Sequence, residues 1–512
     1  MQPRLKHETV KVKKLIEDFR RGAIVIPEFQ RDYVWKKNKA PQLIDSLYQG
    51  FPVSSLLVWQ SSTEEVRSRK RDSRPIMTDW LIDGQQRVIT LVRTMAGDEG
   101  IDVVFNAETE DFQLANAATE KDRAWVRVSE LWDDDLYRNH RRNLDLDGSR
   151  AAEKREEKFE RVREILNYEI PVVRMIEHSF GKAVDAFRRI NTLGVRLKQE
   201  DIESARVAAQ HSGFIADQVA PFLSKLHQQG FNRINIMHLF RACAFIAKPD
   251  GRNRTPLHEL SRSEVVSAWS RTEKATNQAI GLVRSELGLV NMSILWSGAL
   301  VVPLVVLCHQ MSPQRRKSKE LIGWLALAAI CHRYSGASET AIDQDLRACR
   351  ESDPVRALIR NLKSDWDTLA AMPNDFSGTL MDRSGLLALY IACMNRGIQS
   401  FYDGSKVIMQ GDVDRHHILP RAQFPEKTRR RADNLANIAF IAGDVNRSIG
   451  STGPEVYLEK IDPAILRSQC IPEDPALWRI DRAEEFWEAR KSLLAESFND
   501  YIGRALPDRR IE

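Results

Sequence analysis

The segment from Asp412 to Arg447 carries side chains suited to chemistry on a phosphodiester. It reads DVDRHHILPRAQF, then a polar gap, then DNLANIAFIAGDVNR. His416 and His417 stand side by side in it, and it ends on Asn446 and Arg447. Hydrolysis of a phosphodiester needs an activated water, neutralised charge on the phosphate and a stabilised leaving oxygen. A neutral imidazole can supply the first need, and one hard metal ion can supply the other two.

The pattern around these residues predicts two strands followed by a helix. His-His-Ile-Leu-Pro favours a strand that runs into a tight turn at Pro420, and the apolar residues between 434 and 441 favour a second strand. Asp444 has the character of a helix cap, so a helix is expected to begin there. In such a ββα unit, we expect His417 and Asn446 to face each other across a metal ion.

This segment resembles the HNH, or His-Me finger, nucleases, and the resemblance covers about the last quarter of the chain. It implies that His417 is the general base. It also implies that His416 is a metal ligand, at a position where many relatives have aspartate. Asn446, on the helix, matches the second metal ligand. Asn437 matches the residue that fixes the loop, a role that Asn434 is a candidate to share.

The remaining residues of the segment have less specific assignments. Asp414 is a candidate for an additional ligand or for a partner of a ligand. Arg415 and Arg447, with Arg421 as a further candidate, are expected to contact the DNA backbone. The ligand set predicts Mg²⁺ or Mn²⁺, and an imidazole ligand leaves a softer ion open. A structural zinc site is the alternative, but the chain has no CxxC motif to support it.

A second stretch able to bind an anion is WLIDGQQRVITLVRTMAG, residues 80–97. It predicts a strand over Trp80–Ile82, a tight turn at Asp83-Gly84 and a helix over Gln85–Met95. Such a turn presents free backbone N–H groups and the positive end of a helix dipole, which suits a phosphate. The stretch is not a Walker A loop, because it lacks G-x-x-x-x-G-K.

The first 210 residues contain IPEFQRDYVW, LIDGQQRVITL and AFRRINTLGVRLKQEDI in this order. Together these blocks resemble the DGQQR domain of GmrS-type type IV restriction proteins, which is related to the ParB/sulfiredoxin fold. The resemblance implies a regulatory domain that binds a nucleoside triphosphate and is expected to hydrolyse it. GTP, UTP, ATP and CTP are not distinguished. The positions carried over are Gln30, Arg31, Asp83, Gly84, Gln85, Gln86, Arg87, Asn191, Gly194 and Asp201.

Side-chain chemistry suggests a role for several of these positions. We expect Arg87 to neutralise a phosphate. Gln85 or Gln86 can bind the phosphate or orient water, and Asp83 can accept a proton or hold Mg²⁺ through water. Arg31 is expected to clamp a second phosphate, with a structural salt bridge as the alternative. For Asn191 and Gly194 of the third block, the alternative to a binding role is a simple turn before the helix that begins near Gln199.

Composition sets limits on the class of protein. A chain of 512 residues predicts two to four domains. The net charge of +5 is compatible with nucleic acid, but any basic surface must be local. Six scattered cysteines in apolar surroundings predict buried thiols in a reducing compartment. The charged N-terminus lacks the apolar core of a signal peptide, so we expect a cytoplasmic protein.

Several elements are expected from periodicity alone. Arg4–Arg20 predicts an amphipathic helix, and residues 133–164 predict a loop followed by a solvated helix. Residues 204–373 are expected to be almost entirely helical. Met292–Met311 has no charged side chain and approaches transmembrane length. Its polar residues favour a buried helix kinked at Pro303, so no membrane partner is expected.

These observations predict an α+β multidomain protein. We expect a ParB/sulfiredoxin-like NTP-binding domain at 1–205, a helical linker or sensor domain at 206–372 and an HNH-like nuclease domain at 373–512. The combination resembles GmrSD-type enzymes. It implies a nucleotide-regulated, metal-dependent endonuclease that acts on phage or modified DNA in anti-phage defence, with homo-oligomers left open.

Two alternatives remain. One is a nucleotide-switched DNA- or partner-binding protein with an inactive finger. The other is an RNase or tRNase. The complete set of His416, His417, Asn437 and Asn446 favours an enzyme over the inactive finger.

Overall fold

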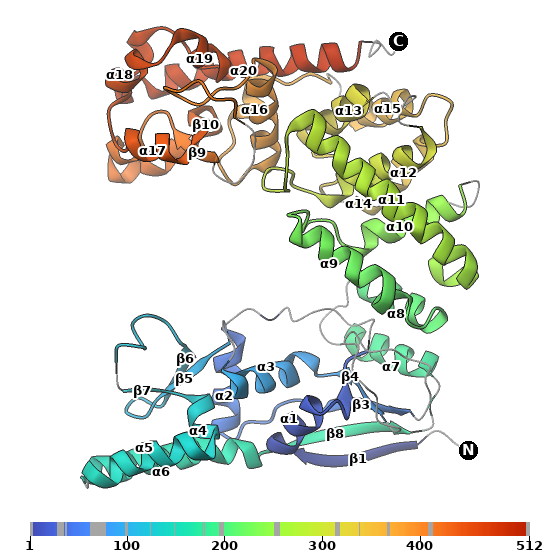
Figure 1. Cartoon of the computed structure of the whole chain (residues 1–512), viewed down its shortest axis with the longest axis vertical. Coiled ribbons are helices and arrows are strands. Elements are labelled where there is room, and N and C mark those ends of the chain that lie inside the picture. Colours follow the sequence, from blue (N-terminus) through green and yellow to red (C-terminus); the bar gives the residue numbers. More distant parts are fainter. Residues whose placement is uncertain are drawn as a thin grey trace. The chain divides into compact units, whose positions relative to one another are not determined.

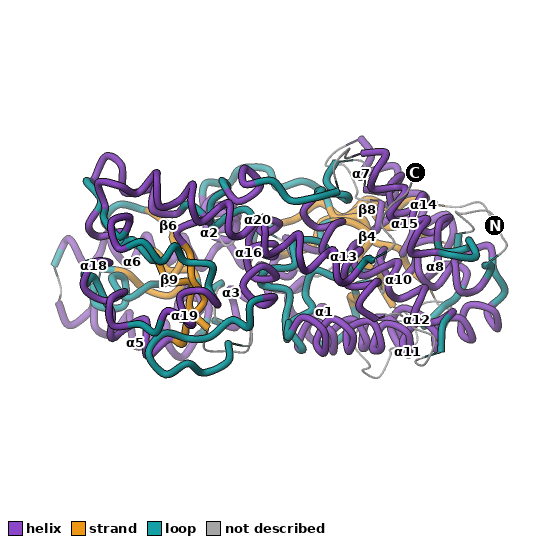
Figure 2. Tube along the Cα trace, turned by 90° about the horizontal axis from the view of Figure 1, so that it is seen from above, coloured by secondary structure: helices purple, strands orange, loops and turns teal. Residues whose placement is uncertain are grey.

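The computed structural model describes residues 4–27, 35, 38–61, 78–97, 101–122, 124–147, 149–176, 178, 180–193, 199–249, 256–312, 318–336, 338–365, 369–407 and 413–507. It is a mixed α and β structure in which helices dominate, as Figure 2 shows. The chain divides into two compact units, Met1–Ala220 and Pro221–Glu512 (Figure 1). The boundaries expected at 205 and 372 stay predictions.

The first unit is built on a mixed five-stranded sheet with the order β1-β8-β3-β4-β2. β1 is antiparallel to β8, β8 is parallel to β3, β3 is antiparallel to β4, and β4 is parallel to β2. The apolar sides of α1, α2 and α3 share one core with this sheet. The elements are β1 Arg4–Lys11, α1 Val12–Arg20, β2 Ile24–Val25, α2 Lys39–Tyr48, β3 Leu56–Ser61, β4 Thr78–Asp83, α3 Gln85–Ala96 and β8 Glu169–Ile176.

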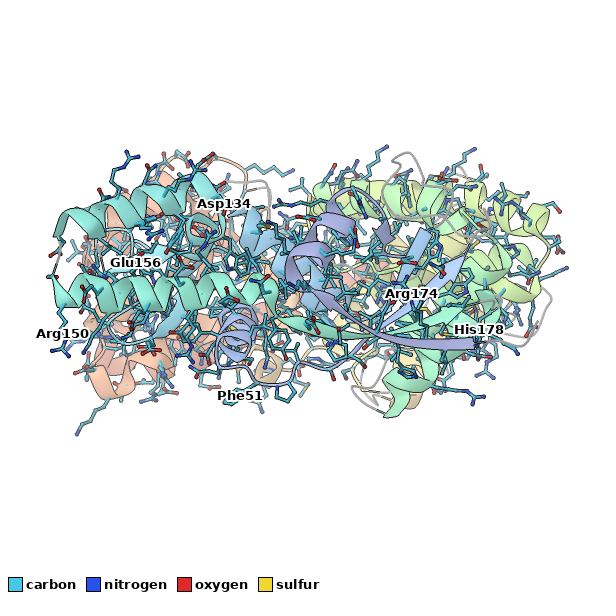
Figure 3. The ribbon with its side chains drawn as sticks, turned by 90° about the horizontal axis from the view of Figure 1, so that it is seen from below. Phe51, Asp134, Arg150, Glu156, Arg174 and His178 are labelled. Carbon is cyan, nitrogen blue, oxygen red and sulfur yellow. The ribbon has the colours of Figure 1, made fainter. Side chains whose placement is uncertain are left out.

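The helix expected over Arg4–Arg20 is wrong in its first half. Residues Arg4–Lys11 form β1, which pairs with β8 along its whole length. Arg174 of β8 reinforces the pairing, since its Nη2 lies 2.6 Å from Glu8 Oε1 (Figure 3). Pairing with a neighbouring strand therefore overrides the local helical pattern. Only Val12–Arg20 is helical, and Val12, Leu15 and Ile16 are its buried residues.

A small sheet and a helical hairpin complete this part of the unit. The sheet has the order β6-β5-β7, and it is followed by α4, α5 and α6. The loop expected at the start of 133–164 is wrong, because Asp134–Asp147 is helical. Charged side chains join the two long helices, as at Arg141 Nε and Glu156 Oε1, 2.8 Å apart (Figure 3). The elements are β5 Val103–Asn106, β6 Asp111–Leu114, β7 Trp125–Arg127, α4 Val128–Trp132, α5 Asp134–Asp147 and α6 Arg150–Glu164.

Helices predominate from residue 180 to residue 365, broadly as predicted. Pro303 does not kink a helix; it lies in the first turn of α12, where the missing N–H costs nothing. In the described part of the chain, no helix is long and apolar enough to cross a membrane. The helices are α7 Phe180–Leu193, α8 Gln199–Gln210, α9 Ala220–Gln228, α10 Ile236–Ala247, α11 Arg262–Leu287, α12 Val302–Gln310, α13 Ser318–Ile330, α14 Ser338–Ala348 and α15 Pro354–Asp365, with a π-helix at Ile215–Val219.

The last part of the chain surrounds a two-stranded antiparallel sheet, β9 with β10. Apolar residues of the flanking helices and turns form one core beside it. All six cysteines of the chain are free thiols and five are buried, as predicted. The elements are α16 Arg383–Asn395, β9 Val413–His417, η7 Glu426–Asp433, β10 Ile438–Ala442, α17 Gly443–Ile449, α18 Pro454–Tyr457, α19 Pro463–Ser468 and α20 Ala483–Ala505.

Two buried polar side chains hold β10 in place. Gln469 Nε2 donates to Phe440 O at 2.6 Å, and Gln469 Oε1 accepts from Phe440 N at 3.3 Å. Arg490 of α20, which is fully buried, donates from Nη2 to Gln469 O at 3.0 Å and from Nη1 to Ala436 O at 2.8 Å. Arg490 thus connects α20 to Gln469, which binds β10, and to Ala436, which precedes β10 in the chain.

We expect Arg490→Met to lower the free energy of unfolding by about 2–5 kcal/mol, because two buried carbonyl groups lose their donors. Thermal and chemical denaturation would measure this loss. Arg479→Met is the control, because Arg479 is exposed and forms its ion pair in the described structure with exposed Asp481. A change within about 0.5 kcal/mol is expected there. If Arg490→Met unfolds at the wild-type midpoint, Arg490 does not support the hairpin.

Candidate active site

The two strands and the helix predicted around the histidine pair are present in the predicted order, as β9, β10 and α17. His417 lies opposite Ile438 in the register, and His416 lies opposite Ala439. Successive side chains of a strand point to opposite faces. Asp414 and His416 therefore share one face of the hairpin, and Arg415 and His417 share the other.

The first face brings together the three side chains predicted to bind a metal. His416 is buried, and its Nδ1 lies 2.8 Å from Asn446 Oδ1 on α17. Asn446 Nδ2 donates to Asp414 Oδ2 at 2.9 Å. The structure thus gathers one imidazole, one amide and one carboxylate on this face of the hairpin.

Tyr457 of α18 determines how His416 uses its two nitrogens. The Tyr457 hydroxyl donates to Ile418 O at 2.6 Å, so its oxygen accepts from His416 Nε2 at 3.1 Å. Burial lowers the pKa of His416 to about 4, so the ring is neutral at pH 7. Its one proton is then on Nε2, and Nδ1 keeps a lone pair directed at Asn446 Oδ1. Tyr457 was not predicted, because nothing in its local sequence relates it to the histidines.

The donor set fits a divalent cation. His416 Nδ1 and Asn446 Oδ1 are two acceptors 2.8 Å apart. Such a contact is favourable when a cation binds both atoms, since neighbouring ligands of an octahedral ion at 2.0–2.1 Å lie roughly 3 Å apart. Within the described residues, no three His, Cys, Asp or Glu side chains gather as a metal cluster. The set of Asp414, His416 and Asn446 would leave further coordination positions to water or substrate, and the metal stays a prediction.

His417 lies on the other face and has a different partner. The expectation that His417 and Asn446 face each other is therefore wrong, because Asn446 contacts His416. Its Nε2 is 3.1 Å from Asp433 Oδ1, at the end of η7. With Nε2–H donating to the carboxylate, Nδ1 keeps the lone pair that a general base needs. The side chain of His417 is 23% exposed, so water can reach it. Asp433 was missed by the sequence interpretation, although it directly precedes Asn434.

Asn437 has the contacts of a residue that fixes a loop. It is fully buried, and its Oδ1 accepts from Leu419 N at 2.9 Å. Its Nδ2 donates to Leu419 O at 3.0 Å and to Ala432 O at 2.9 Å. The amide therefore joins the chain after β9 to the end of η7. Asn434 shapes the same loop, since its side chain accepts from Ala436 N at 2.9 Å.

The predicted anion site of the first unit has the expected backbone. β4 ends at Asp83, Gly84 has a φ of +95°, and α3 begins at Gln85. A side chain at Gly84 would be strained by this φ, and its Cβ would lie 2.2 Å from Leu56 Cδ2. Glycine is therefore required at the turn. Gln86 lies in the first turn of α3, where its Oε1 accepts from Trp35 N at 3.2 Å.

Arg87 has partners within the protein. Its Nη2 donates to Ser55 O at 2.9 Å, its Nη1 donates to Ser54 O, and Asp83 Oδ2 lies 3.5 Å away. Burial lowers the pKa of this guanidinium. These contacts attach α3 to the segment before β3. The role of Arg87 as a phosphate ligand stays a prediction.

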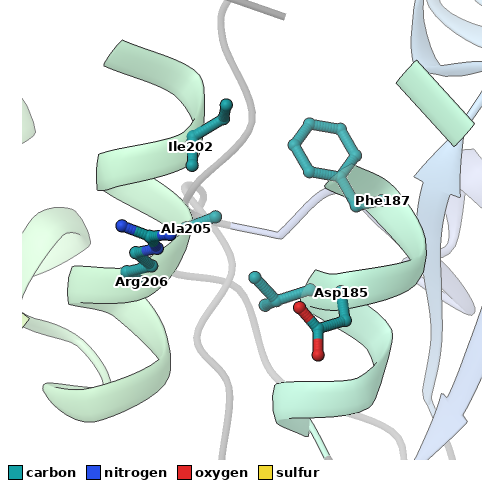
Figure 4. A pocket seen from close by; sticks show the side chains of 6 residues that line it. Asp185, Phe187, Ile202, Ala205 and Arg206 are labelled. Atoms are coloured by element: carbon teal, nitrogen blue, oxygen red, sulfur yellow. The ribbon is translucent and has the colours of Figure 1, made fainter. Parts of the chain in front are cut away.

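Other predicted positions can be placed only in part. Gln30, Arg31 and Gly194 lie outside the described residues, as do the side chains of Asn191 and Asp201. A cavity of about 160 Å³ lies between α7 and α8, near the third sequence block (Figure 4). It is smaller than the roughly 300 Å³ at which small-molecule sites begin. Its lining residues are Val184, Asp185, Phe187, Ile202, Ala205 and Arg206.

Residues 12–208 match the family described as "GmrSD restriction endonuclease, N-terminal domain". The similarity predicted from the three sequence blocks is thereby confirmed for this part of the chain. An uncharacterized protein of Methanocaldococcus jannaschii, MJ0686, is 19% identical to the chain, and the alignment covers 97% of each protein. The similarity to that protein therefore includes both units.

We expect Asn437→Ala to lower the free energy of unfolding by about 2–4 kcal/mol. The substitution leaves the N–H and carbonyl of Leu419 and the carbonyl of Ala432 without their buried partner. Thermal denaturation would measure the loss. Asn434→Ala is the matched control in the same loop, and a loss of about 1 kcal/mol is expected because its side chain accepts one hydrogen bond, from Ala436 N. Equal losses in the two variants would argue against Asn437 as the residue that fixes the loop.

Proposed function

We propose that this chain is a metal-dependent DNA endonuclease of the modification-dependent restriction kind, active in anti-phage defence and regulated by a nucleoside triphosphate. The observation that carries the proposal is that two groups of side chains, a donor set for a metal and a general base with its partner, meet at β9. Asp414, His416 and Asn446 form a donor set, and His417 with Asp433 forms a base and its carboxylate partner. The similarity of residues 12–208 to a restriction endonuclease domain supports DNA as the substrate.

The donor set would hold the ion through His416 Nδ1, Asn446 Oδ1 and the Asp414 carboxylate. A bound divalent ion supplies neutralisation of charge on the scissile phosphate and on the leaving oxygen. Tyr457 keeps the His416 proton on Nε2, which leaves Nδ1 for coordination. Burial of His416 also disfavours its protonated form, so protons compete weakly for this nitrogen.

His417 removes a proton from the attacking water through Nδ1. Asp433 accepts the Nε2–H of the same ring, which fixes the tautomer. As the imidazolium forms, the carboxylate stabilises its positive charge. Arg421 Nε lies 3.9 Å from Asp433 Oδ1, so this carboxylate also faces a guanidinium.

Nucleotide regulation would begin at the turn from β4 to α3. Gly84 opens α3, so the first N–H groups of a 12-residue helix point toward this turn. A phosphate there would lie beside Arg87, whose guanidinium already bridges to the segment before β3. Binding would thus act on the connection between α3 and that segment.

We expect His417→Ala to reduce DNA cleavage by roughly 100- to 10,000-fold, because the general base is lost. The assay uses plasmid and phage DNA, modified and unmodified, with Mg²⁺ or Mn²⁺ and with or without each NTP. The thermal midpoint of the His417→Ala variant should match that of the wild type, since the His417 side chain is partly exposed. Removal of metal by EDTA should abolish cleavage by the wild type.

The control is His258→Ala, a partly exposed histidine of the second unit. It should cut as the wild type does. Cleavage by His417→Ala at the wild-type rate would refute the assignment of the base. Cleavage of RNA in place of DNA would support the ribonuclease alternative.

We expect Asp433→Asn to lower kcat by roughly 10- to 100-fold with little change in KM, because an amide holds the imidazole less well than a carboxylate does. Steady-state cleavage kinetics separate the two constants. Asp481→Asn serves as the control, because Asp481 also pairs with an arginine but lies outside the site. A raised KM with unchanged kcat would mean that Asp433 acts in DNA binding and not on His417.

A further inference from the structure

The face of β9 that carries His417 also carries an arginine without a counter-charge. Arg415 lies on this face, two residues before His417 in β9. In the described part of the chain, its guanidinium has no carboxylate within 4.0 Å and no hydrogen-bond acceptor. Burial lowers the pKa of Arg415, and the charge of Arg383 lowers it further. A partly buried cation thus lies near a second cation.

Arg383 is likewise unmatched by acidic groups among the described residues. It is the first residue of α16, directly after Asp382. The carboxylate of Asp382 caps this helix, with Oδ1 accepting from Ser384 N and from Gly385 N, each at 3.1 Å. The nearest acid in the sequence is therefore engaged by backbone N–H groups.

The packing of α16, which begins at Arg383, is against the face of the hairpin that carries Arg415. Arg415 lies opposite Phe440 in the register, so their side chains share a face. The Phe440 ring contacts Tyr390 of α16 edge to face, with centroids 5.6 Å apart. Just before α16, Leu380 N donates to Asp433 O at 3.1 Å. The start of α16 is thus attached to the segment that carries the partner of His417.

The absence of an acidic partner distinguishes Arg383 and Arg415 from several other arginines of this region. Four arginines nearby in the sequence each have a carboxylate partner. These pairs are Arg431–Glu484, Arg467–Glu473, Arg479–Asp481 and Arg482–Glu485. Two like charges held together without a counter-ion destabilise a fold, so an anion that binds between them would be stabilised in turn.

We propose that Arg383 and Arg415 form a phosphate clamp, which holds the phosphodiester of the nucleic-acid strand next to the one that is hydrolysed by the water that His417 activates. The inference rests on the proposed function and specifies how its substrate is held. Guanidinium groups match phosphate oxygens in geometry and form two parallel hydrogen bonds with them. The exposed side chains of Lys427, Arg429 and Arg430 on η7 also lack a carboxylate within 4.0 Å in the described structure, and they extend the positive surface.

The first test measures binding without cleavage. A duplex oligonucleotide is titrated with wild type, Arg383→Gln, Arg415→Gln and the double variant in EDTA, over a range of salt concentrations. Each substitution should weaken binding about tenfold and reduce the slope of log K against log salt by about 0.9, because one phosphate contact is lost. Arg467→Gln, which removes an exposed arginine paired with Glu473, should leave both values unchanged.

The second test measures stability with inorganic phosphate as the probe. Phosphate should raise the thermal midpoint of the wild type and not that of the double variant. Without phosphate, the double variant should be at least as stable as the wild type, because a repulsive pair is removed. A lower midpoint without phosphate, or an equal phosphate shift in both proteins, would show that the arginines have a structural role, and it would overturn the clamp.

The outcomes separate the clamp from the proposed function. If the double variant cuts DNA with the kcat and KM of the wild type, the clamp is wrong and the nuclease stands. If the wild type cuts no nucleic acid but the phosphate shift depends on both arginines, the clamp stands and the nuclease is wrong. Tighter binding of single-stranded RNA than of duplex DNA would keep the clamp and change the class of substrate.

Discussion

The alternation of side chains along one five-residue strand determines the arrangement of the candidate active site. Because β9 is extended, neighbouring residues His416 and His417 must point to opposite faces of the hairpin. Each face is then completed by different elements. α17 and α18 enclose His416, while η7 supplies the partner of His417 and α16 packs on the same side. His416 is consequently buried and neutral, and His417 is partly exposed.

A hairpin of two short strands is not stable by itself. Here buried amides and one buried guanidinium supply the hydrogen bonds to backbone groups that further strands would supply in a larger sheet. Asn437 satisfies three backbone groups around the turn, and Gln469 satisfies both backbone groups of Phe440. Arg490 joins these two regions through α20. The members of such a network depend on one another, because loss of one side chain leaves the buried groups that it contacted without a partner.

The sequence predicted those parts of the site that are close together along the chain. The strand–strand–helix order follows from local patterns, and so does the glycine turn before α3, where only one residue type fits the backbone. Asp433 and Tyr457 could not be predicted in this way, because tertiary packing brings them to the histidines. Arg87 was predicted to contact a phosphate, and this role stays a prediction. Its hydrogen bonds to the carbonyl groups of Ser54 and Ser55 could not be read from the local pattern, because those residues lie more than 30 positions earlier in the chain. The strand β1 was missed because its partner, β8, lies more than 150 residues away in the sequence.

The side chain of Gln469 also affects self-association through the edge of this sheet. The outer edge of a sheet offers unpaired N–H and C=O groups, which can template a strand from another chain and start aggregation. At Phe440 both groups already bind an amide of the same molecule. The Gln469 side chain therefore takes the hydrogen bonds that a third strand would form at Phe440. At this residue, the apolar strand Ile438–Ala442 cannot pair with a strand of another molecule.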